Sequence, residues 1–269
     1  MFTIISNFRP EMDKLKCFIE QELTFKSLYY QEVLDLPMNK LDWEVCPSLV
    51  FALSMGNEVK KKLIFNLALV TQYTYMAHKI HQLASKEELP ERDRQYAVLF
   101  GDFVLGKVFI LLCQDDLHAY AEDFLSLIKT MNEGVVQRWS LRNKRKTLAD
   151  KELILGKERA LITALAARIS AGIVGMKGKQ IELGKQVGYN LGMAWGGWDE
   201  SLDVAILIKY LAKAKTSILK LDGSNPEYLR DLYNNFSQYI GLGFSQSIPA
   251  EPNRLKPKLR LIAKESKIG

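Results

Sequence analysis

LGMAWGGWDESLD, residues 191–203, places three carboxylates directly after an apolar stretch that contains several glycines. We predict a break at Gly196-Gly197, followed by a helix that begins near Asp199. In such a helix Asp199 and Asp203 lie one turn apart on the same face, with Glu200 beside them. A cluster of this kind suits Mg²⁺, through which a diphosphate is held. The alternative is local, because acidic residues also favour the first turn of a helix.

Apolar residues recur at helical spacing along nearly the whole chain. Leu63, Leu67 and Val70 follow steps of four and three, and strand-like alternation is absent over any useful length. Turn signals divide the chain into about nine helices, which predicts an all-α bundle. A chain of 269 residues with 48% apolar residues is long enough to bury the core of one such domain.

Cysteine usage and hydropathy give expectations about location. Cys17, Cys46 and Cys113 are far apart and form no CxxC pair, which is typical of thiols in a reducing compartment. We therefore expect a cytoplasmic protein. No run was found that approaches the roughly 18 apolar residues of a membrane span, so we expect no transmembrane helix.

The net charge of +6 comes largely from two basic segments. One is RWSLRNKRK, residues 138–146, and the other is RLKPKLRLIAKESK, residues 254–267. Neither belongs to a recognisable nucleic-acid-binding module, so no nucleic-acid partner is expected. Peripheral contact with an anionic membrane surface stays open as an alternative. Prolines interrupt the last segment, which predicts a helical domain at 1–248 and a basic, flexible tail at 249–269.

Four motifs in a fixed order give the chain a family resemblance. They are QYAVLFGDFVL at 95–105, MNEGV at 131–135, GKERALITALAARISAG at 156–172 and YNLGMAWGGWDESLD at 189–203. In order and spacing they resemble the trans-polyprenyl diphosphate synthases. The resemblance implies a single isoprenoid-synthase-like helical bundle around a central cavity. It also implies two facing Asp-rich motifs that bind Mg²⁺ and an allylic diphosphate, which is elongated with isopentenyl diphosphate.

The sequence departs from the family at both diphosphate sites. Residues 78–83, HKIHQL, stand where the first Asp-rich motif belongs and contain no carboxylate. His78 and His81 are interpreted as wall residues of the bundle, since their spacing and the lack of a third ligand do not suit a metal. WEVCP at 43–47 replaces a run of Lys and Arg, so that Glu44 would repel a diphosphate.

The family pattern survives in part elsewhere. Three cations remain as the expected diphosphate contacts: Lys157, Arg92 and Arg94. Asp199, Glu200 and Asp203 remain at the second motif, where the resemblance implies a degenerate site that holds Mg²⁺ weakly or not at all. Without a cation these acids repel one another, so replacing Asp199 and Asp203 by Asn is expected to leave stability unchanged or slightly raised.

A chain that keeps only one of the two acidic motifs is predicted to be inactive alone, because positioning and charge neutralisation supply most of this kind of catalysis. Certain bacteria make menaquinone side chains with a two-component synthase, in which a divergent relative accompanies a catalytic chain. This sequence resembles that auxiliary component of heptaprenyl and hexaprenyl diphosphate synthases. We therefore expect a non-catalytic or regulatory subunit that pairs with a catalytic polyprenyl diphosphate synthase and helps to set product length.

Two alternatives remain open. The first is a divergent active prenyltransferase or terpene-synthase-like enzyme that uses Mg²⁺ at the second acidic motif. The second is a protein that binds prenyl diphosphates or a membrane surface without catalysis.

Overall fold

The computed structural model describes residues 4, 6–23, 38–54, 56–221 and 226–242, and these residues form helices and turns without a strand. The α-helices are α1 (Arg9–Leu23), α3 (Lys40–Ser54), α4 (Lys61–Leu83), α5 (Glu91–Cys113), α6 (Ala121–Ser140), α7 (Leu148–Leu155), α8 (Leu161–Ile173), α9 (Lys179–Asp199), α10 (Val204–Ile218) and α11 (Pro226–Tyr239). Short 3-10 helices are η1 (Ser6–Phe8), η2 (Glu58–Lys60) and η3 (Asp115–Tyr120), and a π-helical turn, η4 (Gly156–Ala160), joins α7 to α8. The prediction of an all-α bundle is confirmed.

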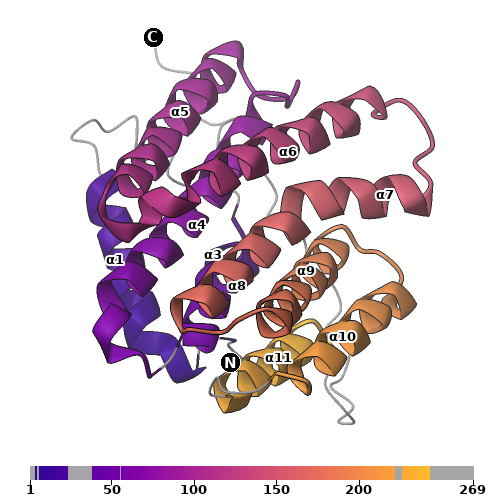
Figure 1. The fold of residues 1–269 in the computed structure, drawn as a ribbon. Helices are drawn as coiled ribbons and strands as arrows, with labels where there is room; N and C mark the ends of the chain where they lie inside the picture. Colours follow the sequence, from indigo (N-terminus) through magenta and orange to yellow (C-terminus); the bar gives the residue numbers. More distant parts are fainter. Residues whose placement is uncertain (1–3, 5, 24–37, 55, 222–225, 243–269) are drawn as a thin grey trace.

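The bundle is built around α8, which packs against α9, α3 and α4 (Figure 1). Helix α10 packs against α9, and α5 packs against α4. The contact between α8 and α9 is close because glycines line it. A Cβ atom at Gly188 or Gly192 would overlap atoms of Thr163, so a larger residue at either position would push the helices apart.

The predicted break at Gly196-Gly197 is wrong. Helix α9 continues through both glycines and ends at Asp199. A Cβ at Gly196 would press on Leu155, and one at Gly197 would overlap Leu207. These two glycines therefore allow neighbouring segments to approach α9 and do not end it. The predicted tail at 249–269 and its boundary lie outside the described residues.

Helix α5 has two apolar faces. One face is buried and consists of Ala97, Phe100, Val104, Val108 and Leu112. The opposite side, which we call the α5 apolar face, exposes Val98 (43%), Leu99 (66%), Phe103 (36%), Phe109 (40%) and Ile110 (52%). Among the described helices, α5 alone is long and apolar enough to span a membrane, with a mean hydropathy of 2.0 in a window that is 33% buried. The sequence-based expectation missed this helix because Asp102 and Lys107 interrupt its apolar run.

Candidate functional site

The three acids of the second motif do not share a helix face. Asp199 is the last residue of α9, and the chain then turns at Ser201, which has a φ of 54°. Asp203 is the N-cap of α10, where its Oδ1 accepts a hydrogen bond from the Ala205 amide at 2.8 Å. The predicted helix from Asp199 to Asp203 is therefore wrong. Asp203 has a local structural role, since a carboxylate that accepts from the first turn stabilises a helix start.

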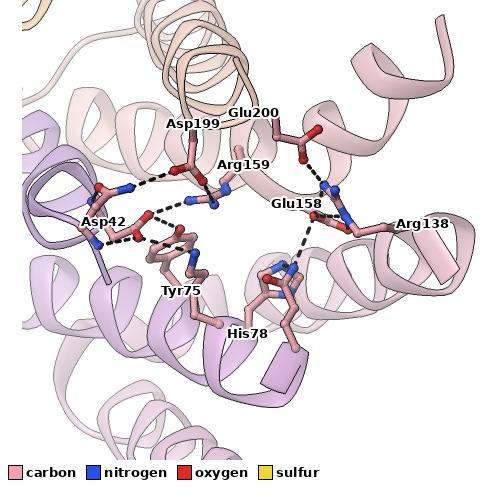
Figure 2. A network of polar contacts seen from close by, with 11 residues as sticks. Asp42, Tyr75, His78, Arg138, Glu158, Arg159, Asp199 and Glu200 are labelled. Carbon is pink, nitrogen blue, oxygen red and sulfur yellow. Dashed lines mark hydrogen bonds and ion pairs between the residues drawn. The ribbon is translucent and has the colours of Figure 1, made fainter. Parts of the chain in front are cut away.

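Asp199 is bound by groups from two distant elements. Its Oδ2 lies 2.7 Å from Nη2 of Arg159, which comes from the π-helical turn η4. Its Oδ1 accepts a hydrogen bond from the side-chain amide of Asn39 at 2.9 Å, just before α3. Both carboxylate oxygens of Asp199 are thus engaged, as Figure 2 shows.

Arg159 joins Asp199 to a second, fully buried carboxylate. Its Nη1 lies 2.7 Å from Oδ1 of Asp42, whose exposed fraction is 0%. The guanidinium group also lies over two adjacent aromatic rings, 4.9 Å from the centroid of Tyr75 and 4.6 Å from that of Trp195. A buried arginine is tolerated only where its charge is paired, and here it has two carboxylates and two ring faces.

Asp42 has further partners on α4. The Tyr75 hydroxyl donates to Oδ1 at 2.5 Å, and the Lys79 ammonium lies 3.5 Å from Oδ2. Gln72 donates to the Asp42 backbone carbonyl at 3.0 Å. Lys79 occupies the segment where the family would have its first Asp-rich motif. A cationic side chain on α4 therefore contacts an acid from α3 at this place.

A second cluster lies beside the first and is centred on Arg138 of α6. Its Nε and Nη2 bind Glu158 at 3.0 and 2.8 Å, and Nη2 also lies 2.5 Å from Oε1 of Glu200. Burial tends to lower the pKa of Arg138, but its hydrogen bond to Glu158 and the charges of Glu158 and Glu200 outweigh burial and raise that pKa. Arg138 therefore stays charged and neutralises an acid on η4 and one that follows α9.

His78 connects the second cluster to α4. Its Nε2 lies 2.9 Å from Nε2 of Gln82, which is also 3.3 Å from a Glu158 oxygen. Burial, together with the neighbouring charge of Lys79, lowers the pKa of His78 to about 3. The imidazole is neutral near pH 7, so Gln82 donates to its unprotonated nitrogen. His81 instead lies 3.1 Å from Asp102 of α5.

These contacts form one group, which we call the ion network (Figure 2). Its charged members are Asp42, Lys79, Arg138, Glu158, Arg159, Asp199 and Glu200. In the part of the chain that the structure describes, no three His, Cys, Asp or Glu side chains are arranged to hold a metal ion. A Mg²⁺ ion bound to Asp199 or Glu200 would have to displace a guanidinium group, so the residues present do not fit such a site.

The predicted diphosphate contacts lie apart from the network's charged centre. Lys157 in η4 reaches Glu133 of α6 at 3.3 Å and lines an open groove of about 720 Å³ on the exposed side of α6. Arg92 is exposed at the start of α5, with its guanidinium 5.7 Å from the Tyr96 ring centroid. Arg94 is partly buried, and its Nε has no hydrogen-bond partner among the described residues. Their role in binding stays a prediction.

The sequence analysis did not identify the cations that organise the site. Arg159 belongs to the motif at residues 156–172, from which only Lys157 was assigned a role. Arg138 was counted only as part of the basic segment at residues 138–146. A signal was present in GKERALITALAARIS, where Glu158 and Arg159 directly precede a strongly apolar stretch. Charges inside an apolar helix need partners, so both residues could have been marked as members of buried ion pairs. Their partners are too distant in sequence to be found that way.

The segment predicted to repel a diphosphate lies inside α3. Glu44 is 6% exposed, and its nearest cation is Lys40 at 3.8 Å. Burial raises the pKa of Glu44 above its usual range, although Lys40 opposes the shift. Burial likewise raises the pKa of the Cys46 thiol to about 12. Neither residue offers positive charge to a phosphate.

Comparison with known proteins places this geometry on a known fold. No protein-family model matches the sequence, and no curated protein is significantly similar to it. Among solved structures, a polyprenyl synthase from Caulobacter crescentus CB15 is similar with a TM-score of 0.71 at 16% identity, covering 87% of this chain and 97% of that one.

Two other similar structures come from geranyl diphosphate synthases. A deletion mutant of the heterotetrameric geranyl pyrophosphate synthase of mint gives a TM-score of 0.62 at 14% identity, covering 84% of this chain and 97% of that one. The geranyl diphosphate synthase small subunit from Antirrhinum majus gives 0.64 at 13% identity, covering 85% and 99%. This chain therefore has the all-α isoprenoid-synthase fold. At these identities the likeness establishes the fold and not the activity.

Proposed function

We propose that this chain is a non-catalytic or regulatory subunit of a heteromeric polyprenyl diphosphate synthase. The observation that carries the proposal is the ion network, in which arginine and lysine side chains bind the carboxylates that a metal ion would need as ligands. Arg159 binds Asp42 and Asp199, and Arg138 binds Glu158 and Glu200. A chain whose remaining acids are neutralised internally has little capacity to gather Mg²⁺ and a diphosphate.

The balance of charge in the network supports this reading. Its four carboxylates face three cations, and each cation is already paired. An incoming diphosphate would meet the net negative charge of these side chains. Opening the network would also leave Asp42 buried without its main partner, which is costly. The alternative of a divergent active enzyme therefore has weaker support.

The α5 apolar face supports the second half of the proposal, a partner subunit. Five large apolar side chains are exposed on one side of this helix, with Asp102 among them, and a gathering of exposed apolar side chains is typical of interaction sites. Gly106 lies in the same region, and a Cβ there would meet no atom within 4 Å, so a partner helix is free to approach. Two of the similar structures are a heterotetrameric synthase and a synthase small subunit, which supports a partner subunit for this chain.

We extend the proposal to the role of the complex. The catalytic partner would be a cytoplasmic polyprenyl diphosphate synthase that carries both Asp-rich motifs, and this chain would help to set product length. The side chain of menaquinone is one product class that such a complex would serve. This finer assignment rests on the sequence resemblance.

The test combines an activity assay with an assembly assay. The purified chain is given Mg²⁺ and labelled allylic and isopentenyl diphosphates, first alone and then with a synthase encoded in the same genome. We expect no turnover alone, a heteromeric complex by light scattering, and a changed product length in the mixture. Turnover by the lone chain at the roughly 1 to 10³ s⁻¹ of ordinary enzymes would overturn the proposal. Absence of a complex with every synthase of that genome would remove its second half.

A further inference from the structure

The connection between α6 and α7 carries an uncompensated cluster of positive charge. Arg142, Lys144, Arg145 and Lys146 lie within five positions, and the sequence contains no acid between Glu133 and Asp150. Arg142 lies 3.9 Å from Glu87, while the three cations that follow have no ion pair among the described residues. The nearest acid in the sequence, Asp150, is already engaged as the N3 residue of the α7 capping box with Thr147.

Exposed apolar side chains flank this charge on both sides. Trp139 is 55% exposed and Val136 is 66% exposed at the end of α6, and Leu148 is 47% exposed at the start of α7. The Arg142 guanidinium lies 4.4 Å from the centroid of the Trp139 ring. Figure 1 places this connection at the outer edge of the molecule, on the right. We call residues 136–148 the α6–α7 corner.

Cations and an exposed indole in one place match the chemistry of a lipid headgroup layer. Trp is enriched at membrane interfaces because its ring is amphipathic, and Arg and Lys are attracted to anionic phosphates there. A polyanion such as RNA would use the cations but would leave Val136 and Leu148 exposed to water. An acidic protein would need its own apolar patch to cover them. The combination therefore favours a bilayer.

We propose that the α6–α7 corner docks on the surface of an anionic lipid bilayer. Trp139 and Leu148 enter the headgroup layer, while the side chains of Lys144, Arg145 and Lys146 contact lipid phosphates. This goes beyond the proposed subunit role, since it needs neither a partner nor a prenyl substrate. Arg138 binds the ion network one residue before Trp139, so docking would bring that end of the bundle to the membrane.

The test uses vesicles and the full chain without a partner. Binding is measured by flotation with vesicles of phosphatidylcholine alone and with vesicles that also contain phosphatidylglycerol. We expect binding only to the anionic vesicles. The triple variant Lys144→Glu, Arg145→Glu and Lys146→Glu should weaken it by more than tenfold, since each surface cation contributes on the order of fivefold. Trp139→Ala should weaken it severalfold.

A matched control makes the same change in charge at another place on the surface. Lys177→Glu, Lys179→Glu and Lys215→Glu alter exposed lysines outside the corner by the same total charge, and this variant should bind like the wild type. Trp fluorescence gives a second readout, because Trp139 is the exposed tryptophan and its emission should shift to the blue on binding. Circular dichroism checks that each variant is folded.

Four results would overturn the proposal. They are no binding to anionic vesicles, equal losses in the corner and control variants, an unchanged Trp139 emission in the bound state, and binding to an oligonucleotide but not to vesicles. The last result would identify the corner as a polyanion site. None of them depends on whether the chain pairs with a synthase.

Discussion

The ion network and the α5 apolar face reverse the usual distribution of side chains. Charged residues such as Asp42 and Glu158 are buried to 1% exposure or less, while Leu99 and Ile110 are more than half exposed on an apolar helix. Buried charges persist only where each is paired, and exposed apolar surface persists where something covers it. The charges of the ion network are thus paired within the fold, whereas the apolar side chains of α5 remain exposed. A chain that serves by contact with other molecules would show this difference.

The largest expected effect comes from removing the central cation of the interior. Arg159→Met leaves the fully buried Asp42 without its main partner and frees Asp199, which should destabilise the fold by about 3 to 5 kcal/mol. Urea unfolding measures the change. Arg142→Met removes an exposed guanidinium and should stay within about 0.5 kcal/mol of the wild type.

A double variant sharpens this first prediction. Adding Asp42→Asn to Arg159→Met removes the stranded charge and should recover part of the loss, which would be a coupling of about 0.5 to 3 kcal/mol. If Arg159→Met costs less than 1 kcal/mol, the network is not held in the geometry described.

Substitutions on the α5 apolar face should weaken partner binding and leave the free energy of unfolding nearly unchanged. Leu99→Glu with Ile110→Glu places two charges on the α5 apolar face and should weaken pairing with a catalytic subunit by about 2 to 4 kcal/mol, as loss of an interface centre does. The free energy of unfolding of the isolated chain should change little, because both side chains are already exposed. Light scattering and urea unfolding give the two readouts. Leu219→Glu, 61% exposed outside α5, is the control that should pair normally.

Buried His78 makes the stability of the fold depend on pH. Its pKa falls from 6.5 in the unfolded chain to about 3 in the fold, so the unfolded chain binds more protons between these values. Stability is therefore expected to fall with decreasing pH across this window, by up to about 1.4 kcal/mol per pH unit from this group. In His78→Gln the curve of stability against pH should be flatter by that amount. Parallel curves for variant and wild type would show that His78 is protonated in the fold.

The smallest effect separates a helix cap from a metal ligand. Asp203→Ala should destabilise the protein by about 1 kcal/mol through loss of the α10 cap, and Asp203→Asn by only a few tenths, because Asn caps about as well as Asp. Thermal unfolding with and without Mg²⁺ measures both. A Mg²⁺-dependent rise in Tm in the wild type that disappears in Asp203→Asn would contradict the assignment.

The elements of the fold were predictable because their signals are local. Helical periodicity predicted the all-α class, and the described residues contain helices and turns without a strand. The prediction at Gly196-Gly197 was wrong because the missing side chain of glycine has two possible effects. It can end a helix, or it can allow another segment to pack closely against a helix that continues. Which effect operates depends on Leu207, which comes from α10 and is not visible in the local pattern.

The site was predictable only in part. Asp199 and Glu200 were identified, but Asp42 and Arg159 lie 117 positions apart and meet only in the folded bundle. The pairing seen in the structure also changes the expectation about stability. Asp199 is not repelled by its neighbours but paired with Arg159, so Asp199→Asn is now expected to destabilise the fold.

The π-helical turn at residues 156–160 has a consequence at the level of the gene. A turn with i to i+5 hydrogen bonds holds one residue more than an α-helical turn, so it behaves like a one-residue insertion between α7 and α8. Deleting one codon within α8 would rotate all following side chains of that helix by about 100° and disrupt its packing. Deleting the codon for Lys157 instead lets the turn relax to an α-helix, with the faces of α7 and α8 kept. Chain length at this turn is thus more tolerant of change than in the helix that follows, although the placement of Glu158 and Arg159 depends on it.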